Sequence, residues 1–315
     1  MTKALLGYTA VVASALCFGT AAIIVKKAYI LGLSPWQVML LQYLIASCLL
    51  LLLGAIFYRE MFRISTKQVF SLSLQGLFGF STWACFYLAL QHISAAQSAI
   101  LLFTYPIIVT LGTVVFFHER IKFIYLLVLG MTVLGTTLAS GLTWQDIDSV
   151  KGLGIFWGLG AALSYALFNI YGQYILNDIR PWTVTFYVQV LSTFLLVIIR
   201  LPEVINLGST QFKELIITFL LATVCTIIPS YLLLIGIKYV GARKTSIIST
   251  FELPTTIFLA YLILGEQIFG LQIIGGLLIF ISIIILILSH ESGVTKRTNK
   301  NSNNCKGPLD SSETI

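Results

Sequence analysis

Charged residues are scarce in this sequence of 315 residues. Asp, Glu, Lys and Arg make up 10% of it, whereas hydrophobic residues make up 58%, and the mean hydropathy is +0.96. A soluble domain needs roughly a quarter of charged residues to cover its surface. Several apolar runs also exceed the roughly 18 residues that mark a membrane span. The composition therefore excludes a soluble globular protein and predicts an integral membrane protein.

Cysteines are also few, and they form no recognisable motif. Four of the five, Cys17, Cys48, Cys85 and Cys225, lie inside apolar runs, and Cys305 lies in the polar tail. Because no CxxC pair or Cys/His cluster is present, the sequence indicates neither a disulfide framework nor a metal site. The segment "GARKTS" lacks the glycines that a phosphate loop needs before its lysine. We therefore expect no cofactor and no ATP-driven pumping by this chain.

The apolar runs predict an all-α membrane protein with ten transmembrane helices. Within hydrocarbon only helices and closed barrels satisfy the backbone, and runs of about 20 residues without strict alternation favour helices. The spans are expected at approximately 4–25, 36–58, 68–90, 94–117, 121–141, 151–175, 182–200, 212–237, 243–264 and 268–290.

Positive charge is in excess, with a formal net charge of +7 at pH 7. Most Lys and Arg residues flank the apolar runs and form no basic stripe, so we expect no nucleic-acid partner. With ten spans, fourteen of the 19 Lys and Arg residues fall on the side of the amino terminus and five on the other side. The positive-inside rule therefore predicts a multi-pass protein of the inner or plasma membrane with both termini in the cytoplasm.

Segments of the first half of the chain return in the second half at an offset near 147 residues. The segment "LGLSPWQV" at 31–38 returns as "LNDIRPWTV" at 176–184. The segment "ISAAQSAI" at 93–100 returns, less clearly, as "VGARKTSI" at 240–247. Internal similarity at a fixed offset indicates two copies of one structural unit.

Each copy contains five of the predicted spans, and this odd number sets their relative orientation. We assign residues 1–147 to the first repeat, 148–291 to the second, and 292–315 to a polar cytoplasmic tail that is expected to be disordered. Because the first repeat begins and ends on opposite sides of the membrane, the second must be inverted with respect to it. Inverted repeats are typical of secondary transporters, whose binding site lies near the midplane between the halves.

The repeated segments across spans four and five resemble those of the drug/metabolite transporter superfamily, and within it the EamA-type transporters. The matching segments are "SAAQSAILLFTYPIIVTLGTVVFFHE" and "GARKTSIISTFELPTTIFLAYLILGE", and the resemblance covers about residues 4–290. It implies a ten-span transporter, not an enzyme, with a cavity lined by spans one, three, four, six, eight and nine. In one departure, Pro106 lies 13 residues before Glu119, but Pro254 lies 12 before Glu266. We therefore expect the kinks of the two halves to differ in position.

Glu252 is the only acid placed clearly inside a predicted span. It follows Arg243 by nine residues, or about 13 Å along a helix. A carboxylate at this depth costs at least a few kcal/mol unless it is paired or neutral. Two interpretations stay open: Glu252 is a proton-coupling group or counter-ion for a cationic substrate, or it is a buried acid bonded to a hydroxyl or backbone group beside Pro254.

Glu119 and Glu266 each end one apolar run and open the next. A carboxylate in the first turn of a helix is stabilised by the helix dipole, by roughly 0.3–1 kcal/mol. We therefore interpret these two residues as structural markers of a turn at the membrane surface.

Aromatic and amide side chains recur within particular spans and are candidates for a substrate cavity. Trp83 and Tyr87 share one face of the third span, and Tyr165 and Asn169 share one face of the sixth. The predicted substrate-binding residues are Trp83, Tyr87, Tyr105, Tyr165, Asn169 and Tyr231. Such a set suits a small organic molecule, including a cation held over aromatic rings. The alternative for each ring is packing against lipid or at the membrane interface.

Together these patterns predict a secondary transporter that moves a small organic metabolite, such as an amino acid or an amine, by alternating access. Proton coupling through Glu252 and facilitated diffusion are both compatible with the sequence, as are export and nutrient uptake. An intramembrane enzyme is the alternative class, but no nucleophile–base pair is evident. The expected partners are a small-molecule substrate and the lipid bilayer, and the expected state is a monomer or homodimer.

Overall fold

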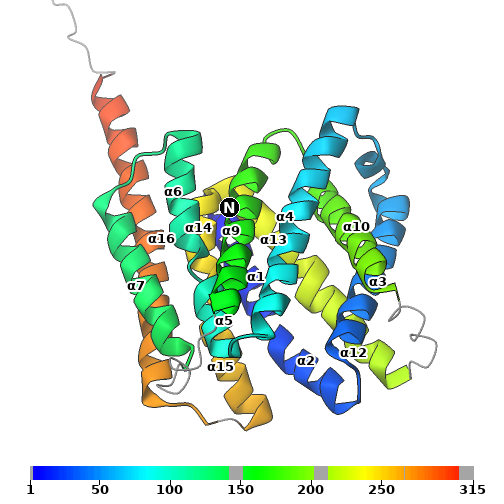
Figure 1. The fold of residues 1–315 in the computed structure, drawn as a ribbon. Helices are drawn as coiled ribbons and strands as arrows, with labels where there is room; N and C mark the ends of the chain where they lie inside the picture. Colours follow the sequence, from blue (N-terminus) through cyan, green and yellow to red (C-terminus); the bar gives the residue numbers. More distant parts are fainter. Residues whose placement is uncertain (1–2, 142–151, 202–211, 266, 305–315) are drawn as a thin grey trace, which may run out of the picture.

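The structure, a computed structural model, describes residues 3–141, 152–201, 212–265 and 267–304, and every regular element in these ranges is helical (Figure 1). The first half contains α1 (Lys3–Gly19), α2 (Ala21–Ile30), α3 (Pro35–Phe57), the 3₁₀ helix η1 (Arg59–Phe62), α4 (Thr66–Leu90), α5 (Ala95–Leu102), α6 (Tyr105–Phe117) and α7 (Phe123–Ala139). The second half contains α9 (Gly152–Ile175), α10 (Pro181–Ile199), α12 (Phe212–Ala222), the π-helical turn η3 (Thr223–Ile227), α13 (Ile228–Val240), α14 (Ala242–Ser249), α15 (Glu252–Leu259), the π-helical turn η4 (Ala260–Leu264) and α16 (Gly270–Asn304).

These helices form the ten predicted spans. Within the described ranges, nine helical segments are long and apolar enough to cross a membrane, and α7 is a shorter tenth. The 17 residues of α7 extend about 26 Å, slightly less than the roughly 30 Å thickness of bilayer hydrocarbon. The all-α fold of ten membrane helices is thus confirmed.

Three spans of the first repeat begin with the same sequence signal. Ser34 accepts a hydrogen bond from the backbone nitrogen of Gln37, whose side chain in turn accepts one from the Ser34 nitrogen. Ser65 with Gln68 and Ser94 with Gln97 form the same reciprocal pair before α4 and α5. A capping box of this kind satisfies two backbone donors that a helix start would leave unpaired. It fixes where these spans begin.

Spans four and nine are each broken into two half-helices near the middle. The breaks fall at Phe103 and Thr104, between α5 and α6, and at Thr250 and Phe251, between α14 and α15. The second half-helices begin at Tyr105 and Glu252, which are separated by the repeat offset of 147 residues. The prolines fall in the first turn of each second half-helix, where their missing N–H is tolerated.

The helices pack in a pattern that is preserved when the two repeats are exchanged. α4 packs against α9 as α13 packs against α1, and α6 contacts α9 as α15 contacts α1. α3 and α10 contact each other as counterparts, and so do α7 and α16. The hydroxyls of Ser47 and Thr193, 146 residues apart on α3 and α10, share a hydrogen bond of 2.7 Å. This arrangement is that of two inverted repeats related by a pseudo-two-fold axis.

Equivalent glycines make equivalent close contacts in the two repeats. A Cβ atom at Gly7 would lie 2.8 Å from Val240, and one at Gly154 would lie 2.5 Å from Ile93. Gly7 and Gly154 are 147 residues apart, and so are their partners Ile93 and Val240. Small residues let membrane helices approach closely, and tight packing replaces the hydrophobic effect as the source of stability in lipid. Gly158, one turn after Gly154, makes a similar close contact, since its Cβ atom would lie 2.5 Å from Leu101.

Basic residues mark one end of the bundle. The loops after α3, α6 and α9 lie together at the upper end in Figure 1. We call this the basic end, and it carries Arg59, Arg63, Arg120, Lys122 and Arg180. The beginning of α1 and the part of α16 near Leu286 join one apolar cluster, so both described ends of the chain lie on this side. α16 extends to Asn304, past residue 292 where the predicted tail begins, and residues 305–315 of that tail lie outside the described residues.

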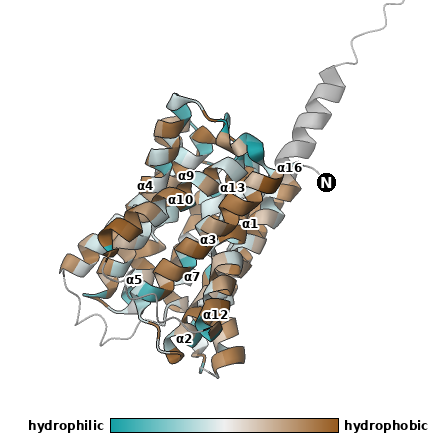
Figure 2. Ribbon diagram, turned by 90° about the vertical axis from the view of Figure 1, so that its right-hand side faces the viewer, coloured by the Kyte–Doolittle hydropathy of each residue, from teal (hydrophilic) through white to brown (hydrophobic). Residues whose placement is uncertain are grey.

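The outer surface of the bundle is apolar. Phe123 on α7 is 78% exposed and Leu271 on α16 is 61% exposed. Figure 2 shows hydrophobic residues along the flanks of the helices and hydrophilic residues concentrated toward the ends. So large an apolar surface is compatible with lipid and not with water. The chain is a multi-pass integral membrane protein.

Candidate functional site

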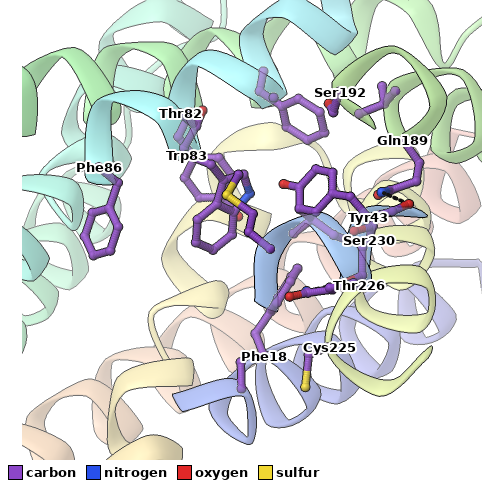
Figure 3. Close-up of a pocket in the computed structure, with 18 of the residues that line it drawn as sticks. Phe18, Tyr43, Thr82, Trp83, Phe86, Gln189, Ser192, Cys225, Thr226 and Ser230 are labelled. Carbon is purple, nitrogen blue, oxygen red and sulfur yellow. Dashed lines mark hydrogen bonds between the residues drawn. The ribbon is translucent and has the colours of Figure 1, made fainter. Parts of the chain in front are cut away.

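A cavity of about 200 Å³ lies between the two repeats (Figure 3). Its lining comes from spans one, three, four, six, eight and nine, as the sequence resemblance implies. Spans two and seven, α3 and α10, also contribute, which the sequence analysis did not anticipate. Since a single water needs roughly 10–15 Å³ of such space, the cavity has room for a small organic molecule.

Aromatic rings form much of the cavity wall. Of the residues predicted from the sequence, Trp83 and Tyr87 on α4, Tyr105 on α6 and Tyr165 on α9 line the cavity. The rings of Tyr105 and Tyr165 lie 4.5 Å apart between centroids. Trp83 is 40% exposed, whereas Tyr105 is only 1% exposed. The cavity is therefore deepest at the Tyr105–Tyr165 pair.

A few polar groups interrupt this apolar wall. Gln42 donates a hydrogen bond of 2.6 Å to Thr226, and Gln189 donates one of 3.4 Å to the Tyr43 carbonyl. The hydroxyl of Ser230 has no partner in the described part of the chain and lines the cavity. Figure 3 shows these groups from α3, α10 and the η3–α13 region around one space. A mostly apolar wall with few convergent polar groups is the usual character of a small-molecule site.

Glu252 also lines the cavity, at the first residue of α15. Its carboxylate forms no hydrogen bond or ion pair with any residue in the described ranges. Tyr105, Tyr165 and Cys225 line the same cavity. Among the described lining residues Glu252 is the only one with a charge, and no Lys or Arg is among them. A proton or a cationic ligand would therefore have to neutralise this carboxylate.

Asn169 does not line the cavity, contrary to the prediction. It is fully buried, and its side-chain nitrogen donates a hydrogen bond of 2.8 Å to the Tyr165 carbonyl one turn earlier. Phe168 precedes Asn169 on α9. Its backbone carbonyl accepts a hydrogen bond from the side chain of Gln75 on α4. Asn169 thus lies one turn beyond Tyr165, at a level where α4 and α9 are in direct contact and leave no cavity between them. Sharing a helix face with Tyr165 is not enough to reach the cavity.

Tyr231 is likewise absent from the cavity lining. Its neighbour Ser230 lines the cavity, and successive residues of an α-helix point about 100° apart. Tyr231 packs edge-on against Trp182 of α10, with ring centroids 5.0 Å apart. Its ring therefore stabilises the contact between α13 and α10 and does not face the site.

Gln42 and Gln189 are cavity residues that the sequence analysis missed. Both amides lie inside apolar runs, where an unpaired polar group is costly. The same criterion that selected Asn169 could have selected them. They lie on α3 and α10, the equivalent second and seventh spans. The family resemblance did not include these spans among those that line the cavity.

Arg243 forms a polar network at the basic end of the bundle. The residue is 4% exposed, and its guanidinium lies 3.0 Å from the carboxylate of Glu119. It also donates hydrogen bonds of 3.0 and 2.8 Å to the hydroxyl of Thr113. Gln173 completes the network by donating to Glu119 at 3.4 Å and accepting from the backbone nitrogen of Ala242 at 2.6 Å.

This network corrects the interpretation of Glu119 as a first-turn carboxylate. α6 ends at Phe117, the C-cap residue His118 adopts a left-handed conformation, and α7 begins only at Phe123. Glu119 therefore lies in the loop between them and pairs with a buried arginine of the other repeat. Glu266, its counterpart, lies outside the described residues.

Known proteins resemble the chain in sequence and in fold. The profile of the EamA-like transporter family matches residues 5–141 and 152–288. A Synechocystis sp. protein named "Uncharacterized transporter sll1319" is 27% identical over 220 residues, which are 69% of this chain. That match spans 65% of the relative's own length. "Uncharacterized transporter YcbK" of Bacillus subtilis is 25% identical over 274 residues, 82% of this chain and 85% of the relative.

A solved structure titled "Crystal structure of protein" shares the fold, with a TM-score of 0.75 at 17% sequence identity. The similarity covers 91% of this chain and 96% of that one. The two profile matches coincide with the two repeats seen in the structure, and they confirm the family that the repeated segments indicated. The chain belongs to the EamA-like transporter family.

Proposed function

We propose that the protein is a secondary transporter that carries a small organic metabolite across the cytoplasmic membrane by alternating access. The observation that supports this proposal is the cavity between two inverted repeats, deep in the bundle and beside the breaks of spans four and nine. Broken helices and a central site between inverted repeats are the usual construction of such transporters.

In the proposed cycle the cavity is closed toward the basic end in this conformation and open toward the opposite end. Toward the basic end, the lining stops at buried residues such as Tyr105 and Leu233, which are 1% and 3% exposed. Toward the opposite end, Trp83 is 40% exposed. The positive-inside rule assigns the basic end to the cytoplasm, so this conformation faces outward. Rocking of one repeat against the other would close the outer end and open the inner one.

Glu252 is the residue proposed to couple transport to a second ion or to bind the substrate's charge. Its carboxylate is inside the cavity without a basic partner, so a bound proton or a cationic substrate would remove the cost of an isolated charge. Trp83, Tyr87, Tyr105 and Tyr165 are the proposed aromatic contacts of the substrate. Asn169 and Tyr231 are not part of this proposal.

The test of transport is counterflow in proteoliposomes that contain the purified protein. Vesicles loaded with an unlabelled metabolite should transiently accumulate the same labelled metabolite from outside, chemically unchanged. A channel would only equilibrate the label, and an intramembrane enzyme would release an altered product. Absence of counterflow for every metabolite that binds the protein would contradict the proposal. Growth of a transport-deficient host on single nutrients, compared with its tolerance of toxic analogues, separates uptake from export.

A further inference from the structure

The charge balance of the cavity restricts the class of ligand that fits it. The described lining contains one acid, Glu252, and no Lys or Arg. The rings of Tyr105 and Tyr165 line the same cavity as this carboxylate and lie 4.5 Å from each other. The remaining polar groups are hydroxyls and amides, two of which, those of Gln42 and Gln189, already bond to protein.

We propose that the ligand is an organic cation, an amine with an aromatic or apolar body, and that ligands bearing a carboxylate are rejected. The proposal rests on the function proposed above and narrows its substrate class. An ammonium group beside Glu252 would gain an ion pair and contact with the aromatic wall of the cavity. A ligand carboxylate would instead enter a cavity whose one charge is negative and whose described wall offers no guanidinium or ammonium. Amino acids, which carry both charges, would bind more weakly than the corresponding amines.

Four probes with the same phenyl body test this proposal: 2-phenylethylamine, phenylalanine, 3-phenylpropionate and 2-phenylethanol. Their binding to the purified full-length protein is measured in detergent at neutral pH. We expect the amine to bind about tenfold or more tightly than the propionate, with phenylalanine and the alcohol between them. Glu252→Gln should remove the preference for the amine, so that the amine and the alcohol bind with similar affinity. Glu60→Gln, which changes an exposed acid at the basic end, is the matched control and should keep the preference.

Three outcomes would overturn the proposal. These are equal or tighter binding of the propionate or of phenylalanine, a preference for the amine that survives Glu252→Gln, and binding of none of the four probes by protein that elutes as a single folded species. Because binding is measured in detergent, the result is separate from transport. Amine binding without counterflow would contradict the transport proposal alone, and counterflow of the propionate would contradict the ligand class alone.

A second inference rests on the network around Arg243, a residue that the first repeat replaces with an alanine. In the repeated segments "ISAAQSAI" and "VGARKTSI", Arg243 of the second repeat stands where the first repeat has Ala96. The guanidinium joins α14 to Thr113 of α6 and to Glu119 in the following loop. The hydroxyl of Tyr105 also donates to the carbonyl of Ser246 at 2.8 Å. Spans four and nine are thus held together at the basic end.

We infer that the Arg243–Glu119–Thr113 network is a gate that keeps the cavity closed at the basic end, and that it biases the protein toward the conformation seen here. The buried guanidinium is satisfied only while α6 and α14 stay together, so opening this end must separate charged partners. Ala96, at the equivalent position of the first repeat, carries no charge and can form no such ion pair.

The gate is tested by labelling a single cysteine, Ser230→Cys in the cavity, in protein without its native cysteines. A membrane-impermeant maleimide is applied from the face that carries the basic end. Glu119→Gln and Thr113→Val should each raise the labelling rate severalfold. Thr113→Ser, which keeps the acceptor oxygen, and Glu60→Gln, which breaks an exposed ion pair at the same end, should not.

Each variant is also checked for a thermal unfolding temperature close to that of the parent, which separates gate opening from loss of structure. Unchanged labelling in folded Glu119→Gln and Thr113→Val would overturn the gate. An equal increase in Glu60→Gln would overturn it as well. If the labelling rates follow these expectations but no counterflow is observed, the result counts against the proposed function and not against the gate.

Discussion

At the scale of single residues, the two repeats differ most clearly at one pair of equivalent positions. Tyr105 and Glu252 each begin the second half-helix of a broken span, and both line the cavity. One repeat therefore supplies an aromatic ring where the other supplies a carboxylate. This single difference turns a symmetric scaffold into a site with one charged wall.

Tyr165 and Tyr231 form a matched pair of tyrosines, one inside the cavity and one outside it. Each ring packs on another aromatic residue, Tyr165 on Tyr105 and Tyr231 on Trp182. Tyr165→Leu should weaken ligand binding by about tenfold, because a lost ring contact is worth roughly 1–1.5 kcal/mol. Tyr231→Leu should change binding less than twofold in folded protein. Isothermal titration with the tightest ligand checks this, and equal losses in the two variants would contradict the assignment.

The sequence was informative about residues where the cost of burial is large. An acid inside a predicted span is expensive, and this cost alone pointed to Glu252 as a candidate site residue. The direction in which an uncharged side chain points depends on how neighbouring helices close around it. For this reason Asn169 and Tyr231 were wrongly placed in the cavity, while Gln42 and Gln189 were missed.

At the scale of elements, the contact between α7 and α16 depends on two glycines. A Cβ atom at Gly275 would collide with the backbone nitrogen of Ala139 and lie 2.5 Å from the carbonyl oxygen of Gly135. The neighbouring hydroxyls of Thr132 and Ser282 share a hydrogen bond of 3.1 Å. These two helices line no part of the described cavity, so the contact serves to hold the repeats together.

Gly275→Ala should destabilise the protein by about 1–3 kcal/mol, because rigid backbone cannot move away from the added methyl group. Gly276→Ala is the control, since its Cβ would meet Pro254 at an ordinary 3.6 Å. The unfolding temperatures of the two variants, measured in detergent, should show a decrease for Gly275→Ala only. A decrease for Gly276→Ala as large as that for Gly275→Ala would show that the backbone contact is not responsible.

The length of the apolar runs predicted the existence and the approximate limits of the spans. It did not predict the irregular segments within them. The prolines at 106 and 254 indicated kinks, yet the breaks occur at equivalent positions although the prolines are offset by one residue. A proline is tolerated anywhere in the first turn of a helix, so its position fixes a break only to within a turn. The π-helical turns in spans eight and nine had no signal in the sequence analysis.

At the scale of the whole molecule, the inverted repeats predict a specific topology. Leu31 and Asp178 are exposed residues at equivalent positions of the two repeats, in loops at opposite ends of the bundle (Figure 1). Single cysteines at these positions should react with an impermeant maleimide from opposite faces, Leu31→Cys from outside and Asp178→Cys from the cytoplasm. Reaction of both from one face would exclude inversion. Reaction from opposite faces with the sides exchanged would reverse the orientation but keep the fold.

The duplication itself was readable from the sequence because both copies kept their turn residues and their span lengths. The odd number of spans then required inversion without further information. The excess of positive charge at one end was predicted, but the burial of Arg243 there was not, because Arg243 looked like one more flanking charge of the positive-inside pattern. Only packing of α14 against α6 shows that this charge is buried and paired.

The central claim is that one cavity is exposed in turn to the two sides of the membrane. The most direct measurement is the reactivity of Ser230→Cys in proteoliposomes toward an impermeant maleimide applied from each face separately. The account predicts reaction from both faces, faster from the end opposite to the basic end, in vesicles that remain impermeable to ions. Reaction from one face only, under all ligand conditions, would contradict alternating access.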